Sequence, residues 1–354
     1  MKNKITIICI VLLIFINIFL IVKQKKKEEL NNKENIGVTV VPTMDDEILS
    51  DTSYCPTFQL VWNDMKNEIV RDDVKFEEDN TFVTNLNKES FNMYDINSDY
   101  YYKIYGPKTI ELKKEIKKSI KEKFNQDSDI LEDFDWSTTN ESDVKRYFFY
   151  AMLYREFEYN AKFSLLGNNK FASYDNIKYF GTNSKSNDKV REQIEVLFYN
   201  SVDSFAVKLN TKSDDEVIFY KNPIGNTFNE IYNNMIKEKD NYNGDKTFSD
   251  TDSFMAPIID FNVKKEYTEL EGKIFKDYQD NDCVIEKALQ TIKFSLNEKG
   301  GKIKSEAGMD NKVMSLEKEP REFYVNDTFA LFLKEKDKDK PYFAVKISDI
   351  TKFN

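Results

Sequence analysis

Two apolar segments near the carboxyl terminus, separated by a long polar arm, constrain the fold more than any other feature of the chain. Residues 288–296 and 323–333 carry the β-branched and aromatic side chains of strands, whereas residues 297–322 between them show no helical period. A connection of this length is uncommon in a compact domain and is usually either functional or disordered. The arm is therefore the first place to look for a function.

Composition and charge exclude several classes of function. The chain has 354 residues, and we expect one large domain. Its 52 basic and 62 acidic residues give a net charge of -10, which disfavours a nucleic acid as partner. The sequence contains no histidine, which removes Ser-His-Asp and Cys-His catalysis and every imidazole metal site. We therefore expect no enzyme, no cofactor and no metal.

The amino terminus predicts a membrane anchor. After a short flank at 1–4, residues 5–22 form an apolar run just long enough to span a membrane as a signal-anchor helix. Lysines precede and follow this run, so the positive-inside count argues weakly against export, but long domains translocate largely regardless of charge. We expect a single-pass protein of the cell membrane with an extracytoplasmic domain, in which 23–55 form a polar tether and 56–354 the folded domain.

The cysteines and the acidic clusters carry weaker signals. Cys55 and Cys283 could form a disulfide outside the cell, or both could be buried free thiols, and the sequence leaves the two readings open. Cys9 lies inside the apolar run. The acidic clusters at 127–135 and 240–252 lack the glycine and the terminal glutamate of a calcium loop, so capping and solvent roles are favoured.

The body reads as an α+β fold with large antiparallel or mixed sheets. Apolar residues recur at helical spacing in 58–70, in 112–124 and in 228–237. Short β-branched or aromatic runs between turn residues predict the strands, which lie at 147–159, 194–199, 205–209, 217–220 and 254–263. Helices first and antiparallel strands later indicate an α+β fold. No glycine-rich phosphate loop is present.

Several of these segments together resemble the serpin family. Residues 292–300, IKFSLNEKG, look like the strand that leads into that family's Glu-x-Gly hinge, and 323–332, FYVNDTFALF, are similar to the segment that re-enters the body. The segment 254–261 resembles the family's Pro-containing strand, and the helix at 112–130 is similar to the one that lies across its main sheet. Ala344 stands where the family usually has glycine, and the front of the domain is short, as in a divergent and trimmed member.

The resemblance gives the arm a function. In serpins a target protease recognises and cleaves this arm, and the freed half then inserts as a new strand into that family's own main sheet. It implies a protease inhibitor, which we expect to be monomeric, with a serine or cysteine protease as its partner. The alternative is a serpin-like surface protein that has lost inhibition and serves in binding or as a structural element.

Insertion makes a demand on the arm sequence, because alternate residues of a strand face opposite sides. Only one register keeps the charged residues Lys302, Lys304 and Glu306 out of the core. The hinge and the inward face of that register consist of Glu298, Gly300, Gly301, Ile303, Ser305 and Ala307. The family's spacing from Glu298 places the cleaved bond at Met314-Ser315, which suits a protease with an apolar first pocket. A longer arm would shift the bond toward Lys318 or Arg321 and a trypsin-like enzyme.

Overall fold

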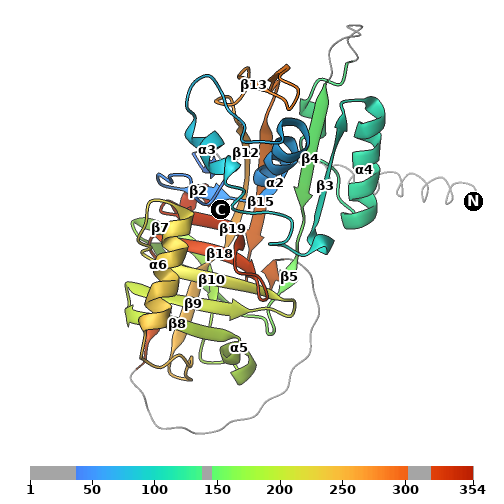
Figure 1. The fold of residues 1–354 in the computed structure, drawn as a ribbon. Helices are drawn as coiled ribbons and strands as arrows, with labels where there is room; N and C mark the ends of the chain where they lie inside the picture. Colours follow the sequence, from blue (N-terminus) through green and yellow to red (C-terminus); the bar gives the residue numbers. More distant parts are fainter. Residues whose placement is uncertain (1–36, 138–145, 302–319, 354) are drawn as a thin grey trace, which may run out of the picture.

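The computed structural model of the chain describes residues 37–137, 146–301 and 320–353, so the predicted membrane span at 5–22 lies outside the described residues. Within these ranges no helix is both long and apolar enough to cross a membrane. Mixed sheets with a few covering helices confirm the predicted α+β class (Figure 1). The helical elements are α2 (Thr57–Asp64), η1 (Met65–Val70), α3 (Thr81–Asn87), η2 (Ser98–Tyr100), α4 (Ile110–Phe124), η3 (Leu131–Asp133), α5 (Asp188–Glu192), α6 (Phe228–Asn241) and η4 (Ile350–Phe353).

A seven-stranded sheet forms the base of the molecule. Its strand order is β1 (Thr39–Val41), β2 (Thr52–Tyr54), β19 (Pro341–Ile347), β18 (Phe329–Glu335), β10 (Asp215–Lys221), β9 (Ser204–Asn210) and β8 (Ile194–Ser201). Every residue of β10 is buried, because this strand lies between β18 and β9 and is covered on both faces.

The helix α6 covers one face of this sheet. Phe228, Ile231 and Met235 recur at helical spacing and are fully buried against it. The Thr227 hydroxyl accepts a hydrogen bond from the Glu230 backbone N–H at 3.0 Å, which caps the helix where it begins. Burying each of these large side chains contributes about 1.5–3 kcal/mol.

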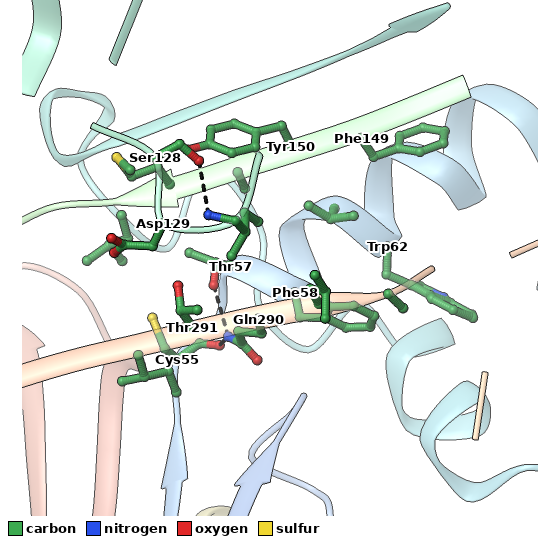
Figure 2. A pocket seen from close by; sticks show the side chains of 18 of the residues that line it. Cys55, Thr57, Phe58, Trp62, Ser128, Asp129, Phe149, Tyr150, Gln290 and Thr291 are labelled. Carbon is green, nitrogen blue, oxygen red and sulfur yellow. Dashed lines mark hydrogen bonds between the residues drawn. The ribbon is translucent and has the colours of Figure 1, made fainter. Parts of the chain in front are cut away.

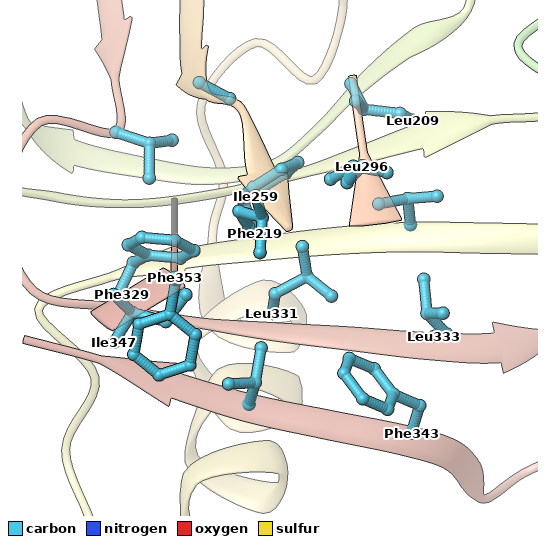
Figure 3. Close-up of a cluster of buried hydrophobic side chains, with 14 of the residues drawn as sticks. Leu209, Phe219, Ile259, Leu296, Phe329, Leu331, Leu333, Phe343, Ile347 and Phe353 are labelled. Atoms are coloured by element: carbon cyan, nitrogen blue, oxygen red, sulfur yellow. The ribbon is translucent and has the colours of Figure 1, made fainter. Parts of the chain in front are cut away.

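The opposite face carries the main core and a second sheet. Figure 3 shows leucine, isoleucine and phenylalanine side chains from β9, β10, β18 and β19 packed together above this face. The second sheet has the order β17 (Glu322–Tyr324), β11 (Ser253–Pro257), β7 (Tyr174–Gly181) and β6 (Ser164–Phe171). Phe254 of β11 packs on Phe219 of β10, with ring centroids 5.9 Å apart, and so joins the two sheets.

Two long strand pairs stand beside each other above the main sheet. One pairs β3 (Tyr101–Pro107) with β4 (Tyr147–Leu153), and the other pairs β12 (Ile259–Glu266) with β15 (Leu289–Leu296), both antiparallel. The helix α4 covers the outer face of the first pair, as its four-residue apolar period predicts. The helix α2 contacts both β4 and β15 from the inner side (Figure 1).

The remaining strands are short. β13 (Ile274–Lys276) and β14 (Asp282–Val284) form a hairpin, and β5 (Phe157–Glu158) pairs with β16 (Gly300–Gly301).

The structure corrects the predicted boundary of the domain. The tether predicted to reach residue 55 ends earlier, because β1 and β2 already belong to the seven-stranded sheet and Val40 and Tyr54 are buried. A strand of three residues is too short to show a period in the sequence. The apolar segment predicted at 323–333 is also two strands, β17 and β18, which lie in different sheets. The strands β6 and β7, which are rich in Asn and Lys, were not predicted.

Candidate functional site

The hinge predicted at the start of the arm is a tight turn. The Gly300 backbone N–H donates to the Asn297 carbonyl at 3.2 Å, and the Asn297 N–H donates back to the Gly300 carbonyl at 3.3 Å. Gly300 has a φ of +117°, which L side chains rarely adopt, and a Cβ there would lie 2.5 Å from the Phe157 carbonyl oxygen. Glycine is therefore required at this position.

The hinge is paired with the body of the protein. Gly300 and Gly301 lie opposite Glu158 and Phe157 of β5 in antiparallel register. On the preceding residues, the Lys299 carbonyl accepts from the Tyr159 N–H at 3.1 Å, and the Glu298 carbonyl accepts from the Phe163 N–H at 2.9 Å. The first residues of the arm are thus already held as a short strand beside β5.

Beside the hinge, a slot separates β4 from β15. Each of these strands is paired on one edge only, β4 with β3 and β15 with β12, and within the described ranges no ladder joins β4 to β15. A cavity of about 560 Å³ lies between them. Figure 2 shows its walls: Phe149 and Tyr150 come from β4, Gln290 and Thr291 from β15, and Phe58 and Trp62 from α2. The slot therefore has an apolar floor and two strand edges that face each other.

Polar groups hold the floor of the slot in place. The Gln290 side chain is buried, and its amide donates to the Cys55 carbonyl at 2.8 Å and to the Thr57 hydroxyl at 2.9 Å. The Tyr267 hydroxyl in turn donates to the side-chain oxygen Oε1 of Gln290 at 2.6 Å. Because the nitrogen and the oxygen of the Gln290 side chain both have hydrogen-bond partners, this buried residue links β15 to the start of α2 with little loss of free energy from desolvation.

The loop after α4 crosses the outer side of the slot. On the β4 side, Trp136 packs on Phe148 with ring centroids 4.7 Å apart. On the side of β15 and β12, Asp129 lies 2.9 Å from the Lys293 ammonium of β15, and Asp133 lies 3.0 Å from the Lys264 ammonium of β12. Asp129 and Asp133, which belong to the acidic cluster seen in the sequence at 127–135, thus form ion pairs. Among the described residues there is no group of acidic or cysteine side chains that could hold a metal ion.

A buried ion cluster lies at the end of the slot nearest the seven-stranded sheet. Arg155 follows β4, and its guanidinium lies against Asp215 of β10, with Nε 2.6 Å from the carboxylate, and also contacts the Glu335 carboxylate of β18. The Tyr342 hydroxyl donates to Asp215 at 2.7 Å, and Arg155 stacks on the Tyr100 ring at 3.7 Å. We name these five residues the Arg155 cluster.

The far end of the arm is also fixed. The Arg321 guanidinium donates to the Asp252 carboxylate, at 2.6 Å for the shorter contact, and to the carbonyls of Asp245 and Thr247. Asp252 is almost fully buried. Burial raises the pKa of its carboxyl, but hydrogen bonds from Arg321 and from the Ser249 N–H outweigh this and leave the pKa below its ordinary value.

The structure places only part of the predicted site. It brings Glu298, Gly300 and Gly301 together at the hinge. Five further predicted residues lie outside the described residues, and they are Ile303, Ser305, Ala307, Met314 and Ser315. Sequence reasoning missed the slot and the Arg155 cluster. The one available signal was a pair of charged residues, Arg155 and Glu156, between the apolar and aromatic residues of 147–154 and Phe157.

Both described cysteines are free thiols. They line the slot cavity, with Cys55 buried and Cys283 half-buried. Burial raises the pKa of the Cys55 thiol to about 11. Of the two readings that the sequence left open, the structure favours free thiols.

Comparisons with known proteins find similarity in structure only. No protein-family profile and no curated protein matches the chain. Among solved structures, the insect serpin Serpin48 of Tenebrio molitor is 11% identical with a TM-score of 0.48, and the alignment covers 85% of this chain and 92% of that one. Serpins, the family that the sequence resembles, are thus among the structures to which this fold is similar.

Two structures of thyroxine-binding globulin in complex with thyroxine are also similar. One is 12% identical with a TM-score of 0.42, over 67% of this chain and 64% of that chain. The human protein is 10% identical with a TM-score of 0.45, over 69% of this chain and 65% of that chain. The chain thus aligns with just under two thirds of each globulin chain. At these identities the likeness concerns the fold and not the activity.

Proposed function

We propose that the protein is a serpin-like inhibitor of a serine or cysteine protease, which acts by inserting its cleaved arm between β4 and β15. One observation carries the proposal: the first residues of the arm, Gly300 and Gly301, are already paired with β5 at one end of the slot, and within the described residues no strand pairs with the edges of β4 and β15 that face each other. An added strand would satisfy the free edges of both β4 and β15. Backbone hydrogen bonds of this kind drive strand addition in other proteins.

The pairing at the hinge defines a register for the rest of the arm. Gly301 lies opposite Phe157, so each further arm residue would meet one residue earlier in the chain on the β4 side. Regular pairing would place Ser305 opposite Leu153 and Ala307 opposite Ala151. These β4 residues pack toward the main core, whereas Phe148 and Tyr150 face α4.

The other side of the slot supports the same register. The bridge between Asn297 and Gly300, continued along β15, would place Ser305 opposite Ile292. Ile292 is buried in the main core, so both neighbouring strands assign the inner face to the same arm residues. This face is the one that the alternation of the arm sequence predicts.

Energetics favour this register over the opposite one. Burying Ile303 on the inner face would contribute about 1.5–3 kcal/mol. A shift by one residue would instead bury Lys302, Lys304 and Glu306, at a cost of several kcal/mol for each unpaired charge. On the outer face Lys302 would lie opposite Glu156, an opposite charge.

The first experiment treats the full chain in detergent micelles with an elastase-like and, separately, a trypsin-like protease. We expect a complex with one of them that resists denaturant, cleavage near Met314, and a large rise in the melting temperature of the cleaved protein. Degradation without a complex, or cleavage without stabilisation, would contradict inhibition. Either outcome would favour the alternative function, a serpin-like protein that serves in binding or as a structural element.

A pair of matched variants tests the register. Ser305→Arg puts a charge on the inner face and should abolish both trapping and the rise in melting temperature. Glu306→Arg introduces the same side chain on the outer face and should preserve both. Both variants are assayed with the elastase-like enzyme, because the new arginine is itself a trypsin site. Equal behaviour of the two variants would refute the register.

We also propose that residues 5–22 anchor the protein in the cell membrane with the domain outside. Protease added to intact cells should then cleave the arm, and it should leave the arm intact if the domain lies inside.

A further inference from the structure

Asn243 and Gly244 form the only asparagine–glycine pair in the sequence. They lie in the turn that follows α6, and both residues are exposed. Asparagine is a chemically labile residue, because its side-chain amide can be lost with time. Glycine has no Cβ, so its backbone nitrogen can approach the side chain of the preceding asparagine without hindrance. This turn is therefore the place in the chain where loss of an amide is easiest.

The contacts of the two residues leave the reacting atoms accessible. The Asn243 amide nitrogen donates to the Asn241 carbonyl at 3.2 Å, at the long end of the usual range, so the side chain is held only weakly. Within the described ranges the Gly244 N–H has no hydrogen-bond partner. A Cβ on Gly244 would lie 2.3 Å from the Tyr242 hydroxyl oxygen, so a larger residue would have to displace that ring. The contact that favours glycine here thus also keeps the pair labile.

The turn is fixed at both ends. On one side α6 ends at Asn241, and Met235 of this helix is fully buried against the main sheet. On the other side the Lys246 carbonyl accepts from the Val196 N–H of β8 at 3.2 Å, and Phe248 is buried. An extra atom in the backbone of the turn would therefore have to be accommodated by the few residues between these two anchors.

The same turn holds the end of the arm. The Asp245 carbonyl accepts from the Arg321 guanidinium at 2.7 Å and from the Tyr242 hydroxyl at 3.5 Å. The Thr247 carbonyl accepts from a second nitrogen of the guanidinium at 2.6 Å, and the Thr247 N–H donates to the Asp245 carboxylate at 2.9 Å. Two of the groups that bind Arg321 thus follow the asparagine–glycine pair within the same turn.

We propose that Asn243 is a site of spontaneous deamidation, and that its isoaspartate product loosens the hold of the turn on Arg321. The Gly244 nitrogen loses its proton and attacks Cγ of Asn243. A bond forms between that nitrogen and Cγ, the bond from Cγ to Nδ2 breaks, and Nδ2 leaves with the proton as ammonia. The product is a five-membered imide ring. The inference concerns the end of the arm and does not depend on insertion of the arm.

Water can open this ring at either of its two carbonyl carbons. Opening at Cγ gives aspartate and leaves the path of the main chain unchanged. Opening at the main-chain carbon of residue 243 routes the chain through the side chain, which lengthens it by one methylene group. Both products carry a carboxylate in place of a neutral amide. Only the lengthened product moves Asp245 relative to α6, so only this one should disturb the hydrogen bonds to Arg321.

The test compares fresh protein with protein aged in warm, mildly alkaline buffer, using the full chain in detergent micelles. Mass spectrometry of the peptide that contains residue 243 measures the loss of the amide. An isoaspartyl methyltransferase with a labelled methyl donor measures the isoaspartate. An arginine-specific protease then reports on Arg321. We expect cleavage after Arg321 to be about tenfold or more faster in the isoaspartate form, because hydrogen bonds to a charged group have been lost.

Two variants and one internal site serve as controls. Asn243→Gln has a longer side chain that would need a larger ring, so ageing should change neither its amide nor its cleavage. Fresh Asn243→Asp has the new charge on an unchanged backbone and should be cleaved like the fresh wild type. Asn183 is also exposed but precedes Ser184, whose Cβ hinders the attack, and should lose its amide far more slowly.

The possible failures are distinct. If the aged native protein keeps the Asn243 amide while the urea-unfolded chain loses it, the folded turn protects the residue and the site is wrong. If isoaspartate forms but cleavage after Arg321 does not change, the link to the arm is wrong. Equally fast cleavage of aged Asn243→Gln would point to other damage, and of fresh Asn243→Asp to the charge, and either result would overturn the inference. None of these results depends on inhibition of a protease, so the proposed function stands or falls separately.

Discussion

The α-carbon of Gly300 lies so close to Phe157 that a single methyl group would collide with the Phe157 carbonyl oxygen. This contact fixes the hinge against β5 and marks where the arm leaves the body. It also makes the hinge sensitive to the smallest possible substitution.

Gly300→Ala should destabilise the protein by about 1–3 kcal/mol, from the strain of a positive φ together with the backbone clash. Urea unfolding of the full chain measures the loss. Gly272→Ala is the matched control, because Gly272 also has a positive φ, +71°, but a methyl group added there would have no atom within 4 Å. It should cost only about 1–2 kcal/mol. Equal losses would mean that the contact with Phe157 is unimportant.

Arg321 should resist cleavage although it lies at the end of the arm. Its guanidinium is held by Asp252 and two carbonyls, and so cannot enter the pocket of an arginine-specific protease. Asp252→Asn should accelerate cleavage after Arg321 about tenfold or more, measured by mass spectrometry of the fragments. Asp250→Asn, which removes an exposed charge from the same turn, should not. Rapid cleavage of the wild type after Arg321 would argue against this anchor.

The contribution of Asp252 to stability should depend on pH in one direction. The pKa of Asp252 in the folded protein lies below its ordinary value of 3.8. A carboxyl with a lowered folded pKa stabilises fully above its unfolded pKa and loses that contribution as the pH falls through the folded value. The difference in unfolding free energy between wild type and Asp252→Asn should therefore be constant at about pH 5 and above and shrink toward about pH 2. A difference that grows as the pH falls would have the wrong sign.

The two described thiols should differ in reactivity. A pKa of about 11 leaves Cys55 with roughly one thiolate in a thousand at pH 8, and the side chain is buried. Iodoacetamide should therefore modify the half-buried Cys283 well before Cys55 in the native protein, and both equally in urea, as measured on the separated peptides. Modification of Cys55 at the denatured rate would show that the floor of the slot opens freely.

Local patterns in the sequence predicted much of the fold, because the period of a helix or a strand can be recognised from residues that are close together in the sequence. Ile116 and Ile120 follow one side of a helix and are fully buried, and the alternating residues of β15 form a strand as expected. The hinge came instead from a family resemblance, because the strand at 292–296 is followed by a glutamate and glycines as in the Glu-x-Gly motif. Very short strands such as β1 carry no comparable period.

The slot could not be predicted, because it arises from two strands distant in the sequence that fail to pair. The same is true of the partners of charged side chains. Arg321 reads as a protease site in the sequence, but its partner Asp252 is 69 residues away. Arg155 and Glu335 are separated by 180 residues. Only the folded backbone brings such groups together.

The order of strands in the main sheet has a consequence for synthesis. β1 and β2 join that sheet only through β19, which is synthesised after all the other strands of the sheet. As the chain emerges from the ribosome, β1 and β2 stay beside an incomplete sheet until β19 has also emerged. The edge of β10 that β18 will cover stays open for the same time. Cellular factors that shield exposed strands during translation should therefore matter more for the yield of this protein than for that of one whose early strands join a sheet made of strands that follow them closely.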